Sequence, residues 1–261
     1  MALRITGLPP VQVTACLSWY DEDPDQLQRM VASLPKVGVT RLVAVDGRYR
    51  LFGPASHGGF RSTPEEHVAL WETCKAVGIQ LITDIPQAEY ANERDKRHRL
   101  FSLAESYAQP GDWLLWIDGD ETVTDWFDPD RSLSDHLRGT TLDVAEVTFI
   151  DHAPREGVVR HWQVPRFFRA GKFAGMGPNH YTLLTHDGPA LWGNQNYRTT
   201  AERFKVPLLI EHHHRDPERQ ERERVFVNER DRLEPEAERF DRSKLTGENY
   251  PLVGEYEVHA G

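Results

Sequence analysis

The most informative part of this chain is the sequence Gly111-Asp-Trp-Leu-Leu-Trp-Ile-Asp-Gly-Asp-Glu121. Its apolar run, residues 113–117, predicts a buried strand that ends directly in acidic residues. Residues two apart in an extended segment point to the same side, so we expect Asp118 and Asp120 to converge. Close carboxylates repel one another unless a cation lies between them, and Mg2+ or Mn2+ binds such oxygens together with phosphates. We therefore predict a metal–diphosphate site here, because α/β proteins bind ligands at the carboxyl ends of strands.

Other interpretations of this motif are open from the residues alone. It can be an acidic surface turn without a function. Asp118-Gly-Asp-Glu-Thr122 also matches the haloacid-dehalogenase pattern of an apolar strand followed by Asp-x-Asp-x-Thr, which makes a phosphatase with Asp118 as nucleophile an alternative. In that class the nucleophile strand normally comes first, whereas about 110 residues precede it here. An EF-hand calcium loop does not fit, because its glycine would fall at Val123 and its closing glutamate at Pro129.

The composition is that of an ordinary soluble protein. The 261 residues suit one large α/β domain or a domain with an appendage. No apolar run approaches the roughly 20 residues of a membrane span, and the N-terminus lacks the features of a signal peptide. Cys16 and Cys74 do not suggest a disulfide framework, so we expect a cytoplasmic protein. The net charge of -10 disfavours broad binding to a nucleic-acid backbone.

Strands and helices alternate before the acidic motif. We expect strands at residues 11–17, 41–46 and 79–83, and helices that begin after Asp23, Thr63 and Asn92. This order predicts a mostly parallel sheet with helices on both faces. Further strands are expected at residues 144–150, 160–168 and 204–212. A charged helix at residues 218–233 follows, so we divide the chain into a domain at 1–215 and a helical extension and tail at 216–261.

Ordered blocks of this sequence resemble family 2-type glycosyltransferases, which have the GT-A fold. The blocks are Tyr20-Asp-Glu22, Val45-Asp-Gly47, Asn92 with Lys96 and Arg97, Trp116-Ile-Asp-Gly-Asp-Glu121, Pro165-Arg-Phe-Phe-Arg169 followed by Gly171-Lys-Phe and Asn179-His180, and Ile210-Glu-His212 through Pro217-Glu218. The resemblance implies a GT-A-like nucleotide-binding fold. It also implies a metal-dependent enzyme that moves a sugar from a nucleotide-diphosphate sugar, with UDP favoured, to a hydroxyl acceptor.

The resemblance and the chemistry together suggest roles for these residues. Asp120 would bind Mn2+ or Mg2+ directly, and Asp118 would contact the metal or the ribose. His212 ends an apolar row with Leu208 and Ile210, and we expect it to complete the metal site; alternation puts His214 on the same side. The residues expected to bind the donor are Tyr20 and Asp46 at the base, and Lys96, Arg97, Arg166 and Arg169 toward the phosphates.

The acceptor side is less defined. An inverting transfer needs a general base, for which Asp151, His180 and Asp187 are candidates, and a retaining course is also open. Tyr181 stands where related sequences often carry an acidic catalytic residue, and Asp21 replaces the usual Asn. The acceptor can be a glycan, a protein or a modified nucleic acid. An alternative from another functional class is a non-catalytic module that binds a nucleotide sugar or a nucleic acid. Nucleic-acid binding would use the arginine-rich residues 215–232, but the glutamates interleaved there favour a solvated helix.

Overall fold

The strand that precedes Asp118 lies inside an eight-stranded sheet, with the strand order β3-β2-β1-β4-β7-β6-β11-β5. The computed structural model describes residues 11–49, 58–153, 158–176, 183–186, 190–192 and 202–213. The strands of this sheet are β1 (Val13–Ser18), β2 (Arg41–Val45), β3 (Gln80–Asp84), β4 (Trp113–Ile117), β5 (Glu121–Trp126), β6 (Val144–Ala153), β7 (Val158–Arg169) and β11 (Arg203–His212). A smaller sheet contains β8 (Phe173–Met176), β9 (Leu183–Thr185) and β10 (Ala190–Trp192).

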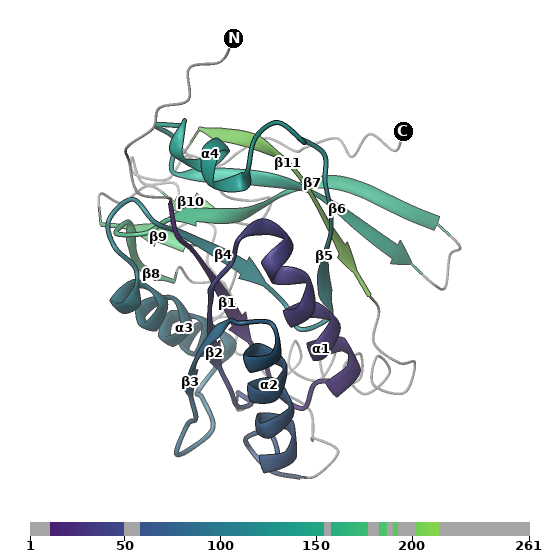
Figure 1. Cartoon of the computed structure of the whole chain (residues 1–261). Helices are drawn as coiled ribbons and strands as arrows, with labels where there is room; N and C mark the ends of the chain where they lie inside the picture. Colours follow the sequence, from purple (N-terminus) through teal and green to yellow (C-terminus); the bar gives the residue numbers. More distant parts are fainter. Residues whose placement is uncertain are drawn as a thin grey trace.

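The large sheet is mostly parallel. β1 pairs in parallel with β2 and β4, β2 with β3, and β6 with β11. β7 runs antiparallel to both of its neighbours, β4 and β6, so β6 and β11 point the same way as β4. Only β5 and β7 run in the other direction among the strands of this sheet that the structure describes. The carboxyl ends of β1, β2, β3, β4, β6 and β11 therefore share one edge of a curled sheet (Figure 1).

The helices begin where the sequence predicts them. Asp23 caps α1 (Pro24–Ser33), Thr63 forms a capping box with Glu66 at the start of α2 (Pro64–Ala76), and Asn92 caps α3 (Glu93–Tyr107). Each cap supplies a side-chain oxygen to backbone N–H groups that lack a partner within the helix. α1 ends before Pro35, which lies inside a 3-10 turn, η1 (Leu34–Val37).

Helices cover both faces of the sheet, as the alternation predicts (Figure 1). Alternate residues of β1 enter different cores: Ala15 and Leu17 pack with α1, α2 and α4 (Leu133–Arg138), whereas Cys16 packs with α3 and β8. All three of these side chains are fully buried. Burying a large aliphatic side chain contributes roughly 1.5–3 kcal/mol, so the sheet is held between two apolar layers.

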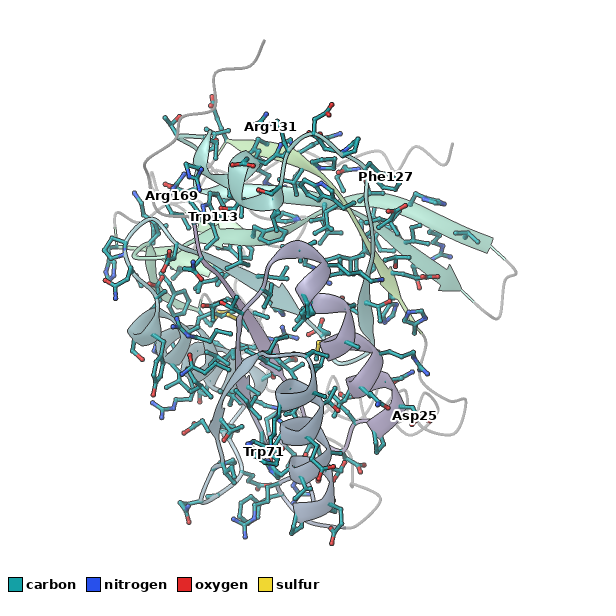
Figure 2. All side chains as sticks on the ribbon, in the orientation of Figure 1. Asp25, Trp71, Trp113, Phe127, Arg131 and Arg169 are labelled. Carbon is teal, nitrogen blue, oxygen red and sulfur yellow. The ribbon has the colours of Figure 1, made fainter. Side chains whose placement is uncertain are left out.

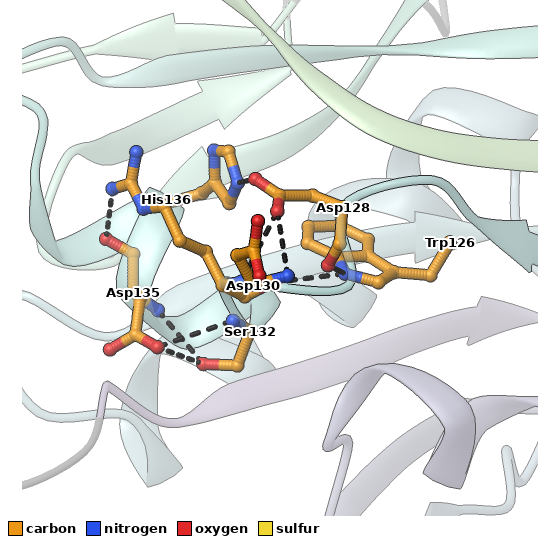
Figure 3. Close-up of polar contacts among 7 residues, drawn as sticks. Trp126, Asp128, Asp130, Ser132, Asp135 and His136 are labelled. Atoms are coloured by element: carbon orange, nitrogen blue, oxygen red, sulfur yellow. Dashed lines mark hydrogen bonds and ion pairs between the residues drawn. The ribbon is translucent and has the colours of Figure 1, made fainter.

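The segment between β5 and α4 forms an ordered corner (Figure 3). The indole Nε1–H of Trp126 donates to the carbonyl oxygens of Asp128 (2.6 Å) and Arg131 (3.0 Å). His136 Nε2 lies 2.7 Å from Asp128 Oδ2. These contacts anchor the end of β5, which borders β11.

Other expectations differ from the structure or fall outside it. The sequence pattern did not predict β5, α4 or the small sheet. The charged helix expected at residues 218–233 lies outside the described residues, and so does the whole proposed extension at 216–261. In the part of the chain that the structure describes, no helix is long and apolar enough to cross a membrane.

Candidate functional site

The turn after β4 is closed by its own glutamate. Glu121 Oε2 accepts a hydrogen bond from the backbone N–H of Asp118 (3.0 Å), and the Glu121 N–H donates to the Asp118 carbonyl (3.1 Å). The other carboxylate oxygen of Glu121 forms a buried ion pair with Arg166 of β7. Burial raises the pKa of Glu121, and the guanidinium of Arg166 acts in the opposite direction. Glu121 therefore connects the turn to β7.

Gly119 allows this turn to lie against the segment that leads from β1 into α1. A Cβ atom at position 119 would come 3.1 Å from Cγ and 3.2 Å from Cδ of Glu22. Because such contacts are closer than ordinary van der Waals packing, any larger residue at 119 must displace Glu22. Glu22 is itself buried. The motif Asp118-Gly-Asp120 thus has a glycine for reasons of space.

Asp120 and His212 lie side by side, as predicted from the sequence. Asp120 Oδ2 is 3.4 Å from His212 Nε2, and the Asp120 carbonyl accepts a hydrogen bond from the His213 N–H (2.7 Å). The sheet creates this proximity, because β11 pairs with β5 in a register that sets His212 opposite Glu121. Leu208 and Ile210, on the same face of β11 as His212, are fully buried.

The second ring nitrogen of His212 also has a carboxylate partner. Nδ1 lies 3.1 Å from Asp151 Oδ1, and the parallel pairing of β11 with β6 sets these two residues opposite one another. Phe149 stacks on the imidazole at 5.8 Å with an interplanar angle of 28°. Burial acts to lower the pKa of His212, but the hydrogen bond and charge of Asp120, followed by the bond from Asp151, raise it to about 9. When no metal ion is bound, the imidazole is therefore protonated at neutral pH, and a metal ion that binds at Nε2 must displace that proton.

Asp118 has different neighbours. Its Oδ1 lies 3.9 Å from Arg97 Nη1, and its Oδ2 lies 3.9 Å from Arg166 Nη1. The two guanidinium groups come from α3 and β7, and both arginines are buried. Each also lies over an aromatic ring, Arg97 over Trp116 at 4.4 Å and Arg166 over Phe149 at 5.2 Å. Such stacking favours a desolvated guanidinium, so both cations are fixed beside the motif.

Lys96 faces the protein interior. Its ammonium donates to the Trp19 carbonyl at 2.8 Å, and the side chain is buried. Burial lowers the pKa of Lys96 to about 8, with Asp46 acting to raise it. Lys96 and Arg97 therefore do not lie on a solvated face of α3, and both point toward the carboxyl ends of the strands.

Asp46 does not present its carboxylate to a ligand in this structure. It is fully buried and accepts hydrogen bonds from the Ser62 backbone (3.0 Å), from the Ser62 hydroxyl (2.7 Å) and from His67 Nε2 (3.0 Å). Burial acts to raise the pKa of Asp46, but the bonds from His67 and Ser62 outweigh it and lower the pKa below 3.8. In this structure the carboxylate anchors the segment that leads into α2, and the expected contact with a nucleotide base stays a prediction.

Tyr20 is engaged in the same region. Its hydroxyl donates to the Gly59 carbonyl, and burial raises the pKa of Tyr20 to about 12. Asp21, which replaces the usual Asn, has a φ of 49°. Asn and Asp are both enriched in this left-handed region, so the replacement is physically mild. Tyr20 lies at the correct edge of the sheet, but its hydroxyl is used in holding a loop.

Arg169, another predicted site residue, is not brought together with Asp118 and Asp120. Arg169 lies over Trp113 at the amino end of β4 and bonds Asp143 at 2.8 Å (Figure 2). It therefore lies at the opposite edge of the sheet from the acidic motif, and the expected role at the phosphates is corrected to a structural one. His180, Asp187 and His214 lie outside the described residues.

Sequence reasoning missed the roles of Glu121 and Phe149. A signal for the role of Phe149 existed: residues two apart in an extended segment lie on the same side, which places Phe149 and Asp151 on one face of a strand. The same strand-end reasoning that selected Asp118 also applies to Asp151. No local signal shows that Glu121 turns back on Asp118, because its partner Arg166 lies 45 positions away.

The donor atoms at this site fit a divalent cation in kind. Asp120 supplies carboxylate oxygen and His212 supplies imidazole nitrogen, a combination that Mn2+ accepts more readily than Mg2+. Among the residues that the structure describes, no group of three His, Cys, Asp or Glu side chains is placed to hold a metal ion. Asp118 instead faces two arginines. Asp120 and His212 are therefore the pair that would hold a cation, and phosphate oxygens of a substrate can complete its coordination.

Comparisons with protein-family models and with curated proteins found no match to this chain. The functional assignment therefore depends on the geometry of the site.

Proposed function

We propose that this protein is a metal-dependent glycosyltransferase of the GT-A type. It would transfer a sugar from a nucleotide-diphosphate sugar, with UDP favoured, to a hydroxyl group. The observation that carries the proposal is the contact between Asp120 and His212, which lie 92 positions apart in the sequence, next to an Asp118 that is flanked by two buried arginines. A carboxylate and an imidazole beside fixed guanidinium groups suit a cation and a diphosphate together.

The proposed role of each residue follows from its charge. When bound, Mn2+ or Mg2+ supplies positive charge that stabilises the diphosphate leaving group. Asp120 and His212 would hold that ion, and Arg97 and Arg166 would face the phosphates. Both guanidinium groups are already fixed by stacking, so they need little reorganisation when negative charge develops on the leaving group. Asp118 keeps the two arginines in place until a phosphate replaces or joins it.

The acceptor chemistry belongs to the same proposal. An inverting course needs a base, for which Asp151, His180 and Asp187 remain the candidates; a retaining course does not need one. Of these, Asp151 is bonded to His212. The acceptor is a hydroxyl of a glycan, a protein or a modified nucleic acid, and a cytoplasmic location is a prediction from the sequence.

Calorimetry tests the proposal directly. UDP, GDP and dTDP are titrated into the protein with Mn2+, with Mg2+ and with no divalent cation. We expect a nucleoside diphosphate to bind at least tenfold more tightly with the metal. Asp120→Asn should abolish this metal dependence, and Asp130→Asn, which changes an exposed aspartate of the β5–α4 corner, should retain it. Equal affinity with and without metal for all three nucleotides would contradict the proposal.

A candidate donor then allows turnover to be measured. Removing one anionic ligand at Asp120 should lower turnover by at least about a hundredfold, the loss typical for one electrostatic contact to a transition state. The Asp120→Asn protein should keep its melting temperature to within a few degrees, because the amide occupies the same volume. Full activity in this variant would contradict the assignment, and a large fall in melting temperature would show that Asp120 is structural.

A further inference from the structure

His212 is held at both nitrogens of its ring. Nε2 faces Asp120 Oδ2 at 3.4 Å, and Nδ1 faces Asp151 Oδ1 at 3.1 Å. The ring has Phe149 stacked against one of its faces. Imidazole can rotate about its bond to Cβ, and either nitrogen can then face a ligand, so a single hydrogen-bond partner at one nitrogen decides which nitrogen is presented.

The partner carboxylate is itself fixed. Asp151 belongs to β6, which lies between β7 and β11, and it pairs in register with Arg160 on one side and His212 on the other. Its side chain is largely buried, at 15% exposure. A carboxylate on a central strand is positioned by the backbone of the sheet and changes its place little. Asp151 therefore has the rigidity that an orienting group requires.

We infer that Asp151 is a positioning residue, which holds the Nδ1–H of His212 so that Nε2 is directed toward a cation bound at Asp120. This inference rests on the proposed function, because it concerns the same metal site. Histidine ligands usually donate their other N–H to a carboxylate or carbonyl group, which fixes the ring and strengthens the ligand nitrogen. The inference gives Asp151 a role through His212, in place of direct proton transfer from the acceptor.

Four properties separate these roles. Replacing a residue that orients His212 lowers metal affinity, and does so only while His212 is present. The loss is larger for Mn2+ than for Mg2+, and an uncharged hydrogen-bond acceptor at the same position restores part of it. A general base affects turnover and leaves metal affinity unchanged. A carboxylate that contributes only its charge affects the affinities for Mn2+ and Mg2+ equally, and replacing it with Asn lowers the affinity as much as replacing it with Ala.

The experiment is a double-mutant cycle on metal binding. Mn2+ and Mg2+ affinities, with UDP present, are measured by calorimetry for the wild type, Asp151→Ala, Asp151→Asn, His212→Ala and the double variant Asp151→Ala/His212→Ala. Glu211→Gln is the matched control. It also removes one negative charge next to His212, but the Glu211 side chain belongs to β11 and lies toward Thr124. Asp151→Ala should weaken Mn2+ binding by about 10–100-fold. The loss for Mg2+ should be smaller, because Mg2+ prefers oxygen ligands.

The cycle has a definite expected result. The double variant should bind Mn2+ as His212→Ala does, with no further loss, since Asp151 acts only through the imidazole. Asp151→Asn should fall between wild type and Asp151→Ala, and Glu211→Gln should match wild type. Additive losses, equal losses for both metals, or an unchanged Asp151→Ala affinity would each overturn the inference.

A measurement without metal keeps failure of the inference distinct from failure of the proposed function. In the metal-free protein, NMR should show a downfield, hydrogen-bonded Nδ1–H resonance of His212, identified by its absence in His212→Ala. Asp151→Ala should remove this resonance while the remaining spectrum shows a folded protein. If the resonance persists in Asp151→Ala, the inference is wrong even when the wild type binds metal. If the wild type binds no metal in any titration, the proposed function fails, and the metal-positioning role of Asp151 fails with it.

Discussion

Asp118 and Asp120 have different surroundings, although only Gly119 separates them. Asp118 lies between two guanidinium groups, each 3.9 Å away. Asp120 lies against the imidazole of His212. The difference arises because the turn directs one carboxylate toward α3 and β7 and the other toward β11. An acidic pair that looks symmetrical in sequence therefore has two guanidinium groups beside one carboxylate and an imidazole beside the other.

The two adjacent histidines at the end of β11 should respond differently to truncation. His212→Ala should weaken metal-dependent nucleotide binding by about 10–100-fold, because it removes a ligand nitrogen. His213→Ala should change it by less than about threefold, because the His213 ring bonds the Thr122 hydroxyl at 2.7 Å. Calorimetry with Mn2+ and UDP compares the variants. A larger loss in His213→Ala would reverse the assignment.

Adding one methyl group at position 119 should disturb the turn. In Gly119→Ala, the new Cβ would lie 3.1 Å from Cγ of the buried Glu22, and 3.3 Å from Cδ2 of Leu27. We expect a loss of about 1–3 kcal/mol in the free energy of unfolding, which is typical of overpacking in a close-packed site. Denaturant unfolding measures the loss. Gly171→Ala is unsuitable as a control because Gly171 has a φ of 83°. Ala76→Gly, at an exposed position at the end of α2, is used instead to check that small changes elsewhere are tolerated.

At the scale of elements, buried polar groups hold loops onto strand ends. Asp46 at the end of β2 anchors Ser62 and His67, at the start of α2, and Glu121 at the start of β5 anchors Arg166 of β7. Each pair joins elements that are distant in sequence but adjacent at one edge of the sheet. Removing one partner of such a pair leaves the other buried without compensation, which is the costly case.

The Asp46 anchor predicts a particular dependence of stability on pH. The pKa of Asp46 is lowered from 3.8 in the folded state, so its contribution to stability is fully present above the unfolded pKa. The contribution is lost as pH falls through the folded-state pKa. Asp46→Asn should cost about 1–3 kcal/mol at neutral pH, because an amide cannot accept all of the hydrogen bonds made by Asp46.

The measurement is the difference in unfolding free energy between wild type and Asp46→Asn as a function of pH. This difference should be constant above about pH 5 and should shrink as pH falls below 3.8. Asp130→Asn should show no comparable trend, because Asp130 is exposed. A difference that grows on acidification would mean that the folded state raises the pKa of Asp46.

At the scale of the whole molecule, the sheet order creates the site. β4 and β11 lie three positions apart in the strand order, separated by β7 and β6, yet the chain continues from β4 through its turn into β5 on the far side of β11. The sheet curls so that the turn after β4 reaches the end of β11 (Figure 1). A ligand at this edge would contact residues from α3, β4, β7 and β11 together.

A ligand that joins these elements should stabilise the folded chain as a unit. Saturating UDP with Mn2+, at about 100 times the dissociation constant, should raise the unfolding free energy by about 2.7 kcal/mol. For a protein of this length that corresponds to a rise of several degrees in melting temperature. The shift should vanish in Asp120→Asn and without Mn2+. If Mn2+ without UDP raised the melting temperature of Asp120→Asn as much as that of the wild type, the ion would bind at another site.

Much of the fold was predictable because its signals are local. The β4 strand follows from five consecutive apolar residues, and the starts of α1, α2 and α3 follow from Asp23, Thr63 and Asn92, which bond N–H groups only two or three residues away. β5 was missed because its sequence, Glu-Thr-Val-Thr-Asp-Trp, is mostly polar. It is an edge strand and owes its conformation to pairing with β11.

The position of the site followed from the sequence, whereas the role of each side chain required the tertiary structure. The end of β4 indicates where the acidic motif lies, and the period of two places His212 on the same face of β11 as Leu208 and Ile210. The expected convergence of Asp118 and Asp120 was wrong, because Gly119 and Asp120 form a turn, in which a period of two does not hold. Whether a carboxylate is covered, as Asp46 is by Ser62, or meets an imidazole, as Asp151 does, depends on strand order and register. Strand order and register are set by packing between segments tens of residues apart, so they cannot be predicted from the residues next to each side chain in the sequence.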